Sequence, residues 1–255
     1  MTTLFLLNAF RYLTTLTPIG GHHSRTSNRR KFIGVFDKEE HMGYLMQGAN
    51  VLIVANGTWP TQAIWKPLVD NSNIIVACDG AIVQLLQNDI VPDYVVGDLD
   101  SIPIEMMDSQ IESLDITVIP MLNQNSSDLS KALKYCENLA TKGIDVIGIE
   151  GGRLDHQIGA YFSLCEHNSN AVLHLEKWIA RLVLSEGLVI DSIEKGQNVS
   201  LFAIGSVKGV NISGVKWPLE NEQLAPGTNG LHNESNGEQI QISHRGGHLL
   251  LLVER

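Results

Sequence analysis

The chain has 255 residues, of which 44% are hydrophobic and 18% are charged, a composition typical of a globular protein with a substantial core. Lysine and arginine number 18 against 28 acidic residues, giving a net charge of −10, so no nucleic-acid partner bound through a broad basic face is expected. Three cysteines without CxxC spacing, Cys78, Cys136 and Cys165, argue against a disulfide framework or a structural zinc site and are compatible with the cytoplasm.

The first 45 residues have an unusual composition. They contain no acid before Asp37 and carry five basic residues ahead of it. Such a segment is typical of an organelle presequence, a poor signal peptide or sequence read from too early a start codon. No run in the chain approaches the ~20 apolar residues that span a bilayer, so no membrane partner is expected. We expect residues 1–45 to be a disordered extension without a catalytic role, with Met42 or Met46 as the functional start.

From residue 50 onward, predicted strands alternate with predicted helices. Apolar runs that end in turn residues predict strands at 50–57, 73–80, 93–100, 115–120 and 144–152. Apolar residues at helical spacing predict helices at 61–69, 82–89, 126–143 and 153–167, the third entered through Ser126 or Ser127 and ended by Gly143. The alternation predicts an α/β domain over residues 46–170, built on a mostly parallel sheet with helices on both faces.

Beyond about residue 170 the pattern changes. Short segments rich in Val, Ile, Leu and Ser are separated by Gly, Asn and Pro, and none shows a helical period. This pattern predicts a smaller all-β unit, a sandwich or a barrel, over residues 171–255.

Polar residues follow all five predicted strands of the α/β domain. In open α/β sheets, ligands bind at the carboxyl ends of the strands. The residues at these ends are Asn56 and Gly57; Asp79 and Gly80; Asp98, Asp100 and Ser101; Asn123, Gln124, Asn125, Ser127 and Asp128; Gly151, Gly152, Arg153, Asp155 and His156. Each acid by itself is explained as a helix cap or a turn residue, but the four acids Asp79, Asp98, Asp100 and Asp128 at one edge indicate a shared function.

Among the acids at the strand ends, Asp98 and Asp100 are the closest in sequence, separated only by Leu99. In an extended turn, carboxylates at positions i and i+2 face the same side and repel each other unless a cation lies between them. Hard oxygen ligands of this kind suit Mg²⁺, which also binds substrate phosphates. With Asp79 and Asp128 nearby, the sequence predicts metal-assisted chemistry at this edge.

Five segments, in this order, resemble the thiamin pyrophosphokinase family: "CDGA", "PDYVVGDLDS", "NQNSSDLSKAL", "GGRLDH" and "SGVKWPLENEQLAPGT". The likeness runs from residue 50 to about residue 253. It implies an α/β ATP-binding catalytic domain followed by a β-sandwich thiamin-binding domain, working as a homodimer. The implied reaction is transfer of the pyrophosphoryl group of ATP to thiamin, giving thiamin diphosphate and AMP. No Ser–His or Cys–His nucleophile system is visible, as expected for polyphosphate transfer, which depends on metal and positioning.

The resemblance assigns roles to residues that match the family's motifs. It implies a catalytic role for Asp79, Asp100, Asp128 and Arg153, with Asp79 or Asp100 orienting the thiamin hydroxyl or accepting its proton. It implies Mg²⁺ ligation by Asp79, Asp98 and Asp100. It implies ATP contacts from Asn56, Gly80, Ser101, Asn125, Ser127 and Asp155. It implies thiamin contacts from Gln124, Trp217, His232 and Asn233, with Trp217 covering the thiamin ring across the dimer interface; its alternative is a core tryptophan of the sandwich.

The chain departs from the family's pattern at three positions. Asn123 and Asn125 stand where the family usually has carboxylates, and His232 stands where serine is usual. Two other functions therefore remain open. The first is a thiamin- or nucleotide-binding regulator that lost turnover, and the second is a metal-dependent nucleotide phosphohydrolase.

Overall fold

The structure is a computed structural model, and it describes residues 48–102, 111, 113–137 and 142–255. The predicted extension at residues 1–45 and the alternative starts at Met42 and Met46 lie outside the described residues. In the described part of the chain, no helix combines the length and the apolar character needed to cross a membrane.

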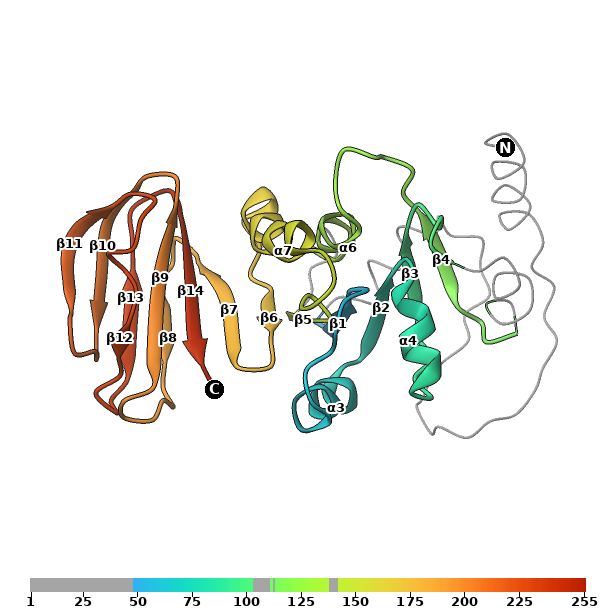
Figure 1. The fold of residues 1–255 in the computed structure, drawn as a ribbon, viewed down its shortest axis with the longest axis horizontal. Coiled ribbons are helices and arrows are strands. Elements are labelled where there is room, and N and C mark those ends of the chain that lie inside the picture. The colour runs from blue at the N-terminus through green and yellow to red at the C-terminus, as the bar shows by residue number, and fades with distance from the viewer. Residues whose placement is uncertain (1–47, 103–110, 112, 138–141) are drawn as a thin grey trace. The chain divides into compact units, whose positions relative to one another are not determined.

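The elements follow the predicted order (Figure 1). The helices in the described residues are α3 (Gln62–Asn71), α4 (Ala81–Gln87), α6 (Asp128–Glu137) and α7 (Leu154–His167). The strands of the α/β part are β1 (Asn50–Val54), β2 (Ile74–Cys78), β3 (Tyr94–Gly97), β4 (Thr117–Pro120), β5 (Gly143–Ile147) and β6 (Val172–His174). The later strands are β7 (Trp178–Val183), β8 (Leu188–Ile190), β9 (Asn198–Ile204), β10 (Val207–Ser213), β11 (Leu219–Leu224), β12 (Asn233–Glu234), β13 (Ile240–Ser243) and β14 (His248–Glu254).

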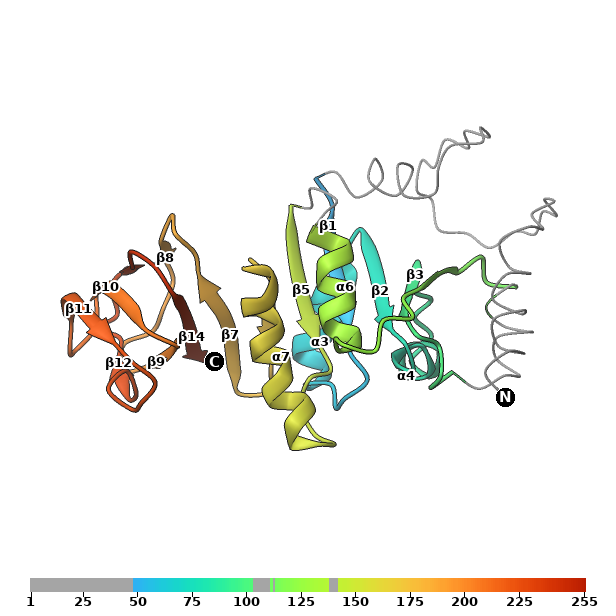
Figure 2. The same cartoon turned by 90° about the horizontal axis from the view of Figure 1, so that it is seen from above.

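The α/β part is built on parallel strands, as predicted. β5, β1, β2, β3 and β4 are neighbours in that order, and each pair is parallel. Successive side chains of a strand point to opposite faces, so Val51 and Ile53 of β1 pack in a core with α6 and α7, whereas Leu52 and Val54 pack in a core with α3 and α4. Figure 2 shows α6 and α7 running side by side. The predicted fold class is therefore confirmed, with helices on both faces.

The C-terminal part is all β in the described residues. An antiparallel sheet in the order β11, β10, β13, β8 packs against the end of the main sheet formed by β9 and β14. Alternating residues fill the space between the two sheets, with Val199 and Leu201 of β9 meeting Val210 and Ile212 of β10 in one core. This is a sandwich, the first of the two predicted architectures.

Four strands, β1, β2, β3 and β5, end before the predicted residues 57, 80, 100 and 152. β1 ends at Val54 and β5 at Ile147, because the segments after them bond to each other: the Gly57 N–H donates to the Gly148 carbonyl at 2.7 Å. A Cβ at Gly148 would lie 2.2 Å from the Ala55 carbonyl oxygen, so only glycine permits this approach. Gly143, predicted to end the third helix, is instead the first residue of β5.

Candidate active site

Three of the four predicted acids meet at the carboxyl edge of the parallel sheet. Asp79 directly follows β2, Asp98 directly follows β3, and Asp128 opens α6. One ligand atom from each of these carboxylates lies within 4.8 Å of the other two. We call these three residues the acid cluster. Its oxygen donors fit a divalent metal ion of the hard type.

A glycine at the end of β3 makes room for the acid cluster. A Cβ added at Gly97 would lie 2.8 Å from the Asp79 Cβ and 3.4 Å from the Asp128 Oδ1. Any larger residue would therefore push Asp79 out of place. The glycine of the segment "PDYVVGDLDS" is therefore part of the site together with its acids.

A second glycine brings together three residues that were predicted to bind ATP. A Cβ at Gly80 would lie 2.7 Å from the Asn56 Nδ2 and 3.2 Å from the Ser101 Cβ. Asn56, Gly80 and Ser101 therefore form one closely packed surface beside Asp79.

Asp79 is the most buried member of the cluster, with 3% of its surface exposed. Its Oδ2 accepts a hydrogen bond from the Ser101 N–H at 3.2 Å, but its buried Oδ1 has no hydrogen-bond partner among the described residues. Burial raises the pKa of Asp79, and the neighbouring Asp128 carboxylate adds to this although hydrogen bonds to Ser101 oppose it. A buried carboxylate oxygen without a partner fits a metal ion or a proton.

Lys131 joins the acid cluster, and the sequence interpretation missed it. Its side chain is 4% exposed, and its Nζ lies 2.8 Å from the Asp128 Oδ1 and 3.8 Å from the Asp98 Oδ2. Burial favours the neutral amine, but the hydrogen bond to Asp128 and the surrounding carboxylates together raise the pKa of Lys131. The signal in the sequence is its spacing, because a lysine three residues after an acid lies on the same helix face.

Asp100 lies outside the acid cluster. The turn after β3 is not extended, because Leu99 adopts a φ of 68° and buries its side chain in the core beside α4. The Asp100 side chain is exposed, and its Oδ1 accepts a hydrogen bond from the Ser101 hydroxyl at 3.0 Å. The structure therefore brings Asp98, but not Asp100, to Asp79 and Asp128.

The loop after β4 reaches the cluster through Gln124. Its Nε2 donates to the Asp98 Oδ2 at 3.2 Å. The Asn125 N–H donates to the Asn123 Oδ1 at 2.9 Å, which closes a local turn. Ser127 caps α6, as predicted, because its Oγ accepts a hydrogen bond from the Ser130 N–H at 3.1 Å.

Arg153 and Asp155 form a bidentate pair at the start of α7. The Arg153 Nη2 donates to the Asp155 Oδ2 at 2.6 Å and its Nε donates to the Oδ1 at 3.1 Å. Their side chains are 74% and 62% exposed. The hydrogen bonds from Arg153 lower the pKa of Asp155 to about 2. Among the described residues, no ion pair joins either side chain to the acid cluster.

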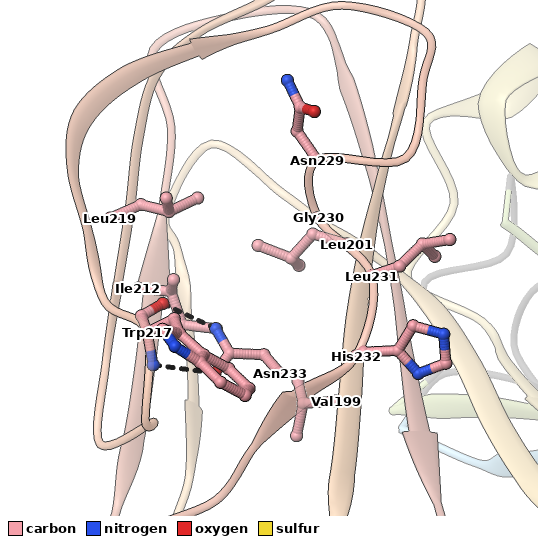
Figure 3. A pocket seen from close by; sticks show the side chains of 10 residues that line it. All are labelled: Val199, Leu201, Ile212, Trp217, Leu219, Asn229, Gly230, Leu231, His232 and Asn233. Carbon is pink, nitrogen blue, oxygen red and sulfur yellow. Dashed lines mark hydrogen bonds between the residues drawn. The ribbon is translucent and has the colours of Figure 1, made fainter.

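Trp217, Asn233 and His232 border a pocket of about 260 Å³ in the sandwich (Figure 3). The backbone N–H of Trp217 donates to the Asn233 Oδ1 at 3.1 Å, and the Asn233 Nδ2 donates to the backbone carbonyl of Trp217 at 2.7 Å. The indole is 52% exposed, so Trp217 is not a core residue. The Lys216 Nζ lies 4.5 Å from its ring centre, which shows that the ring face accepts a cation. His232 lies on the opposite side of the pocket from the indole.

The acid cluster and the tryptophan pocket lie far apart in one chain. Val199 and Leu201 of β9 line the pocket, and Asp79 follows β2. In the ten-stranded sheet β9 and β2 are separated by six strand-to-strand steps, a path of about 29 Å across the strands at about 4.8 Å per step.

Known proteins resemble both parts of the chain. Residues 65–174 match the family model "Thiamin pyrophosphokinase, catalytic domain", and residues 187–249 match "Thiamin pyrophosphokinase, vitamin B1 binding domain". Thiamine pyrophosphokinase 1 of Arabidopsis thaliana is 28% identical over 162 residues, which cover 59% of this chain and 60% of that relative's length. The match thus spans less than two thirds of that relative.

Solved structures titled thiamin pyrophosphokinase share the fold of this chain. Thiamin pyrophosphokinase from Geobacillus thermodenitrificans superposes with a TM-score of 0.68 at 21% identity, covering 81% of this chain and 97% of that one. The yeast enzyme superposes with a TM-score of 0.62 at 16% identity, covering 81% of this chain and 86% of that one. These structures have the architecture described above.

Proposed function

Because this chain belongs to the thiamin pyrophosphokinase family, we propose that it transfers the pyrophosphoryl group of ATP to the hydroxyl of thiamin, giving thiamin diphosphate and AMP. The observation that carries this proposal is the close approach of Asp79, Asp98 and Asp128 at the carboxyl edge of the sheet. Polyphosphate transfer depends on positioned cations rather than on a protein nucleophile.

We propose that Asp79, Asp98 and Asp128 hold Mg²⁺. The unpartnered Oδ1 of Asp79 supports this assignment because a buried carboxylate oxygen needs a cation or a proton. Bound Mg²⁺ would supply charge neutralisation on the phosphate oxygens. The sequence also predicts Asp100 as a ligand of Mg²⁺, and that role stays a prediction. Its exposed position outside the cluster suits it better to accept the proton of the thiamin hydroxyl.

ATP is proposed to lie along the edge formed by Asn56, Gly80 and Ser101. Close packing of these residues beside Asp79 supports this placement. Arg153 offers exposed guanidinium donors to the phosphates, and Asp155 orients them through the bidentate pair. Contacts from Asn125 and Ser127 remain predictions, and the hydroxyl of Ser127 already serves as the cap of α6.

Thiamin is proposed to lie against Trp217, with Asn233, His232 and Gln124 as its polar neighbours. The thiamin ring is cationic, and an exposed indole face binds cations. Gln124 bonds to Asp98 at the acid cluster, so the four residues divide between two places that are separated by several strands of the sheet in one chain. A site that uses all of them needs two chains.

We therefore propose a homodimer in which each thiamin site combines the acid cluster of one subunit with the tryptophan pocket of the other. A stripe of exposed apolar residues on α7, Leu154, Ile158 and Phe162, supports a partner surface on the α/β part. The family models end at residue 174 and begin at residue 187, which supports two domains close to the predicted division at 46–170 and 171–255, with β6 still belonging to the parallel sheet. A cytoplasmic location is also proposed, because all three cysteines are free; recovery of the protein in an organelle fraction would refute it.

One assay tests the reaction. The protein is incubated with ATP, Mg²⁺ and thiamin, and the products are separated. AMP and thiamin diphosphate in equal amounts are expected. Thiamin binding without AMP would instead indicate a regulator, and phosphate release that does not need thiamin would indicate a hydrolase.

A subunit-mixing experiment tests the shared site. Asp98→Asn disables the acid cluster and Trp217→Ala disables the pocket. At thiamin concentrations well below the KM, the first variant alone is expected to be nearly inactive and the second to keep about one tenth of wild-type activity. Mixed dimers contain one site with both halves intact, so co-expression should restore about one quarter of wild-type activity. No recovery in purified mixed dimers would refute the shared site.

A further inference from the structure

Lys131 has an environment that a structural lysine does not require. Its side chain is 4% exposed, and both of its ion-pair partners, Asp128 and Asp98, belong to the acid cluster. Among the described residues, Lys131 is the only basic side chain that forms an ion pair with the cluster. A buried ammonium group costs several kcal/mol unless it is paired, so its position on these carboxylates is specific.

The charges of the site leave room for a divalent cation together with Lys131. When all are ionised, three carboxylates and one ammonium group carry two net negative charges, which one divalent cation neutralises. A neutral site does not attract a polyphosphate through its net charge. It needs directed donors, and a lysine ammonium group provides three of them.

The backbone of Lys131 is held in place by its neighbours. The Lys131 N–H donates to the Ser127 carbonyl at 2.9 Å. The preceding Ser130 donates its hydroxyl hydrogen bond to the Glu166 carboxylate of α7 and lies 2.9 Å from the His167 Nε2. The first turn of α6 is thus fixed to α7. Movement of the Lys131 ammonium group therefore has to come from its long side chain, which has four rotatable bonds.

We propose that Lys131 is a polyphosphate-binding residue that neutralises the acid cluster in the metal-free protein and transfers its ammonium group to phosphate oxygens when a metal–nucleotide complex binds. A divalent cation on Asp128 and Asp98 repels the ammonium group and competes for the Asp128 Oδ1 that Lys131 now contacts. The released group lies beside the position where the nucleotide phosphates approach the same metal. This inference rests on the proposed function for the use of a nucleoside triphosphate.

Calorimetric titration of the full chain without thiamin tests the proposal. Lys131→Met keeps the length of the side chain and removes its charge, and Lys134→Met is the matched control because Lys134 is exposed on the same helix. We expect the affinity of Lys131→Met for MgATP to fall by about 10- to 100-fold, as for the loss of a charged hydrogen bond. Its affinity for Mg²⁺ alone should rise by about threefold or more, because a competing cation is gone. The Lys134→Met variant should match the wild type in both titrations.

Two results would overturn the proposal. If Lys131→Met binds MgATP with an affinity within about twofold of wild type, Lys131 does not contact the phosphates. Parallel loss of Mg²⁺ and MgATP affinity would show that Lys131 only holds the carboxylates in place.

If Lys131→Met does not fold, Lys131→Gln replaces it; failure of both neutral variants, with Lys131→Arg folded, would mark a purely structural ion pair. Wild-type protein that binds no MgATP would overturn the proposed function as well, whereas thiamin diphosphate synthesis with unchanged MgATP binding in Lys131→Met would overturn this inference alone.

Discussion

The substitution Gly97→Ala places a single methyl group between two members of the acid cluster. The added Cβ would lie 2.8 Å from the Asp79 Cβ and 3.4 Å from the Asp128 Oδ1. Carbon atoms in contact prefer about 3.5–4.0 Å, so Asp79 has to move by nearly 1 Å. Asp79 is buried and already has a left-handed φ of 42°, so it cannot yield freely. We expect the free energy of unfolding to fall by about 1–3 kcal/mol, as for overpacked cores.

Thermal unfolding and Mg²⁺ titration measure the effect. At about 2–4 °C per kcal/mol for a protein of this size, the melting temperature should fall by about 2–12 °C. Displacement of one ligand should weaken Mg²⁺ binding at least about tenfold. The control is Gly159→Ala in α7, where the new Cβ meets nothing within 4 Å and should stabilise the helix by about 0.5–1 kcal/mol. A Gly97→Ala variant with wild-type melting and wild-type Mg²⁺ affinity would refute the reasoning.

Three further predictions concern the proposed site. Asp100→Asn should lower turnover by at least about 100-fold through loss of the carboxylate that accepts the hydroxyl proton, and near-normal activity would remove Asp100 from the reacting groups. Trp217→Ala should raise the KM for thiamin by about 10-fold, as for a lost cation–π contact, without changing the KM for ATP; equal changes in both constants would contradict the pocket assignment. Arg153→Met should return the pKa of Asp155 from about 2 to about 4. Because the folded-state pKa is depressed, the stabilisation from this pair is complete above about pH 4 and is lost as the pH falls toward 2; a carboxyl NMR titration that gives the same pKa in both proteins would disprove the pairing.

Much of the fold could be predicted because short local patterns of residues indicate each strand, turn and helix start. Each parallel strand is a short apolar run, and each is followed by residues that form turns or begin helices. Ser127 illustrates this, since its position before α6 and its cap on Ser130 follow from the same preference of serine for helix starts. The convergence of Asp79, Asp98 and Asp128 also followed from one rule, that the carboxyl ends of parallel strands share an edge.

Other features depend on contacts that no local pattern contains. Asp98 and Asp100 were expected to face the same side, but burial of the Leu99 side chain beside α4 rotates the chain between them into a left-handed turn. From the sequence alone, Lys131 is expected to be a solvent-exposed helix residue. Its ion pair with Asp98, which follows β3, is a tertiary contact that the local sequence does not indicate. The separation of the acid cluster from the Trp217 pocket depends on the strand order, which places β14, β7, β6, β5 and β1 between β9 and β2.

The amides at positions 123 and 125 bear on whether the chain retains turnover. The Asn123 Oδ1 accepts the Asn125 N–H in a local turn, a role that aspartate and asparagine share. Both side chains are exposed, and neither belongs to the acid cluster. The residue between them, Gln124, is the one that reaches Asp98. Replacing two carboxylates here therefore changes the charge beside the proposed metal site and leaves its three ligands intact. For this reason an active pyrophosphokinase explains the site better than a regulator that has lost its metal.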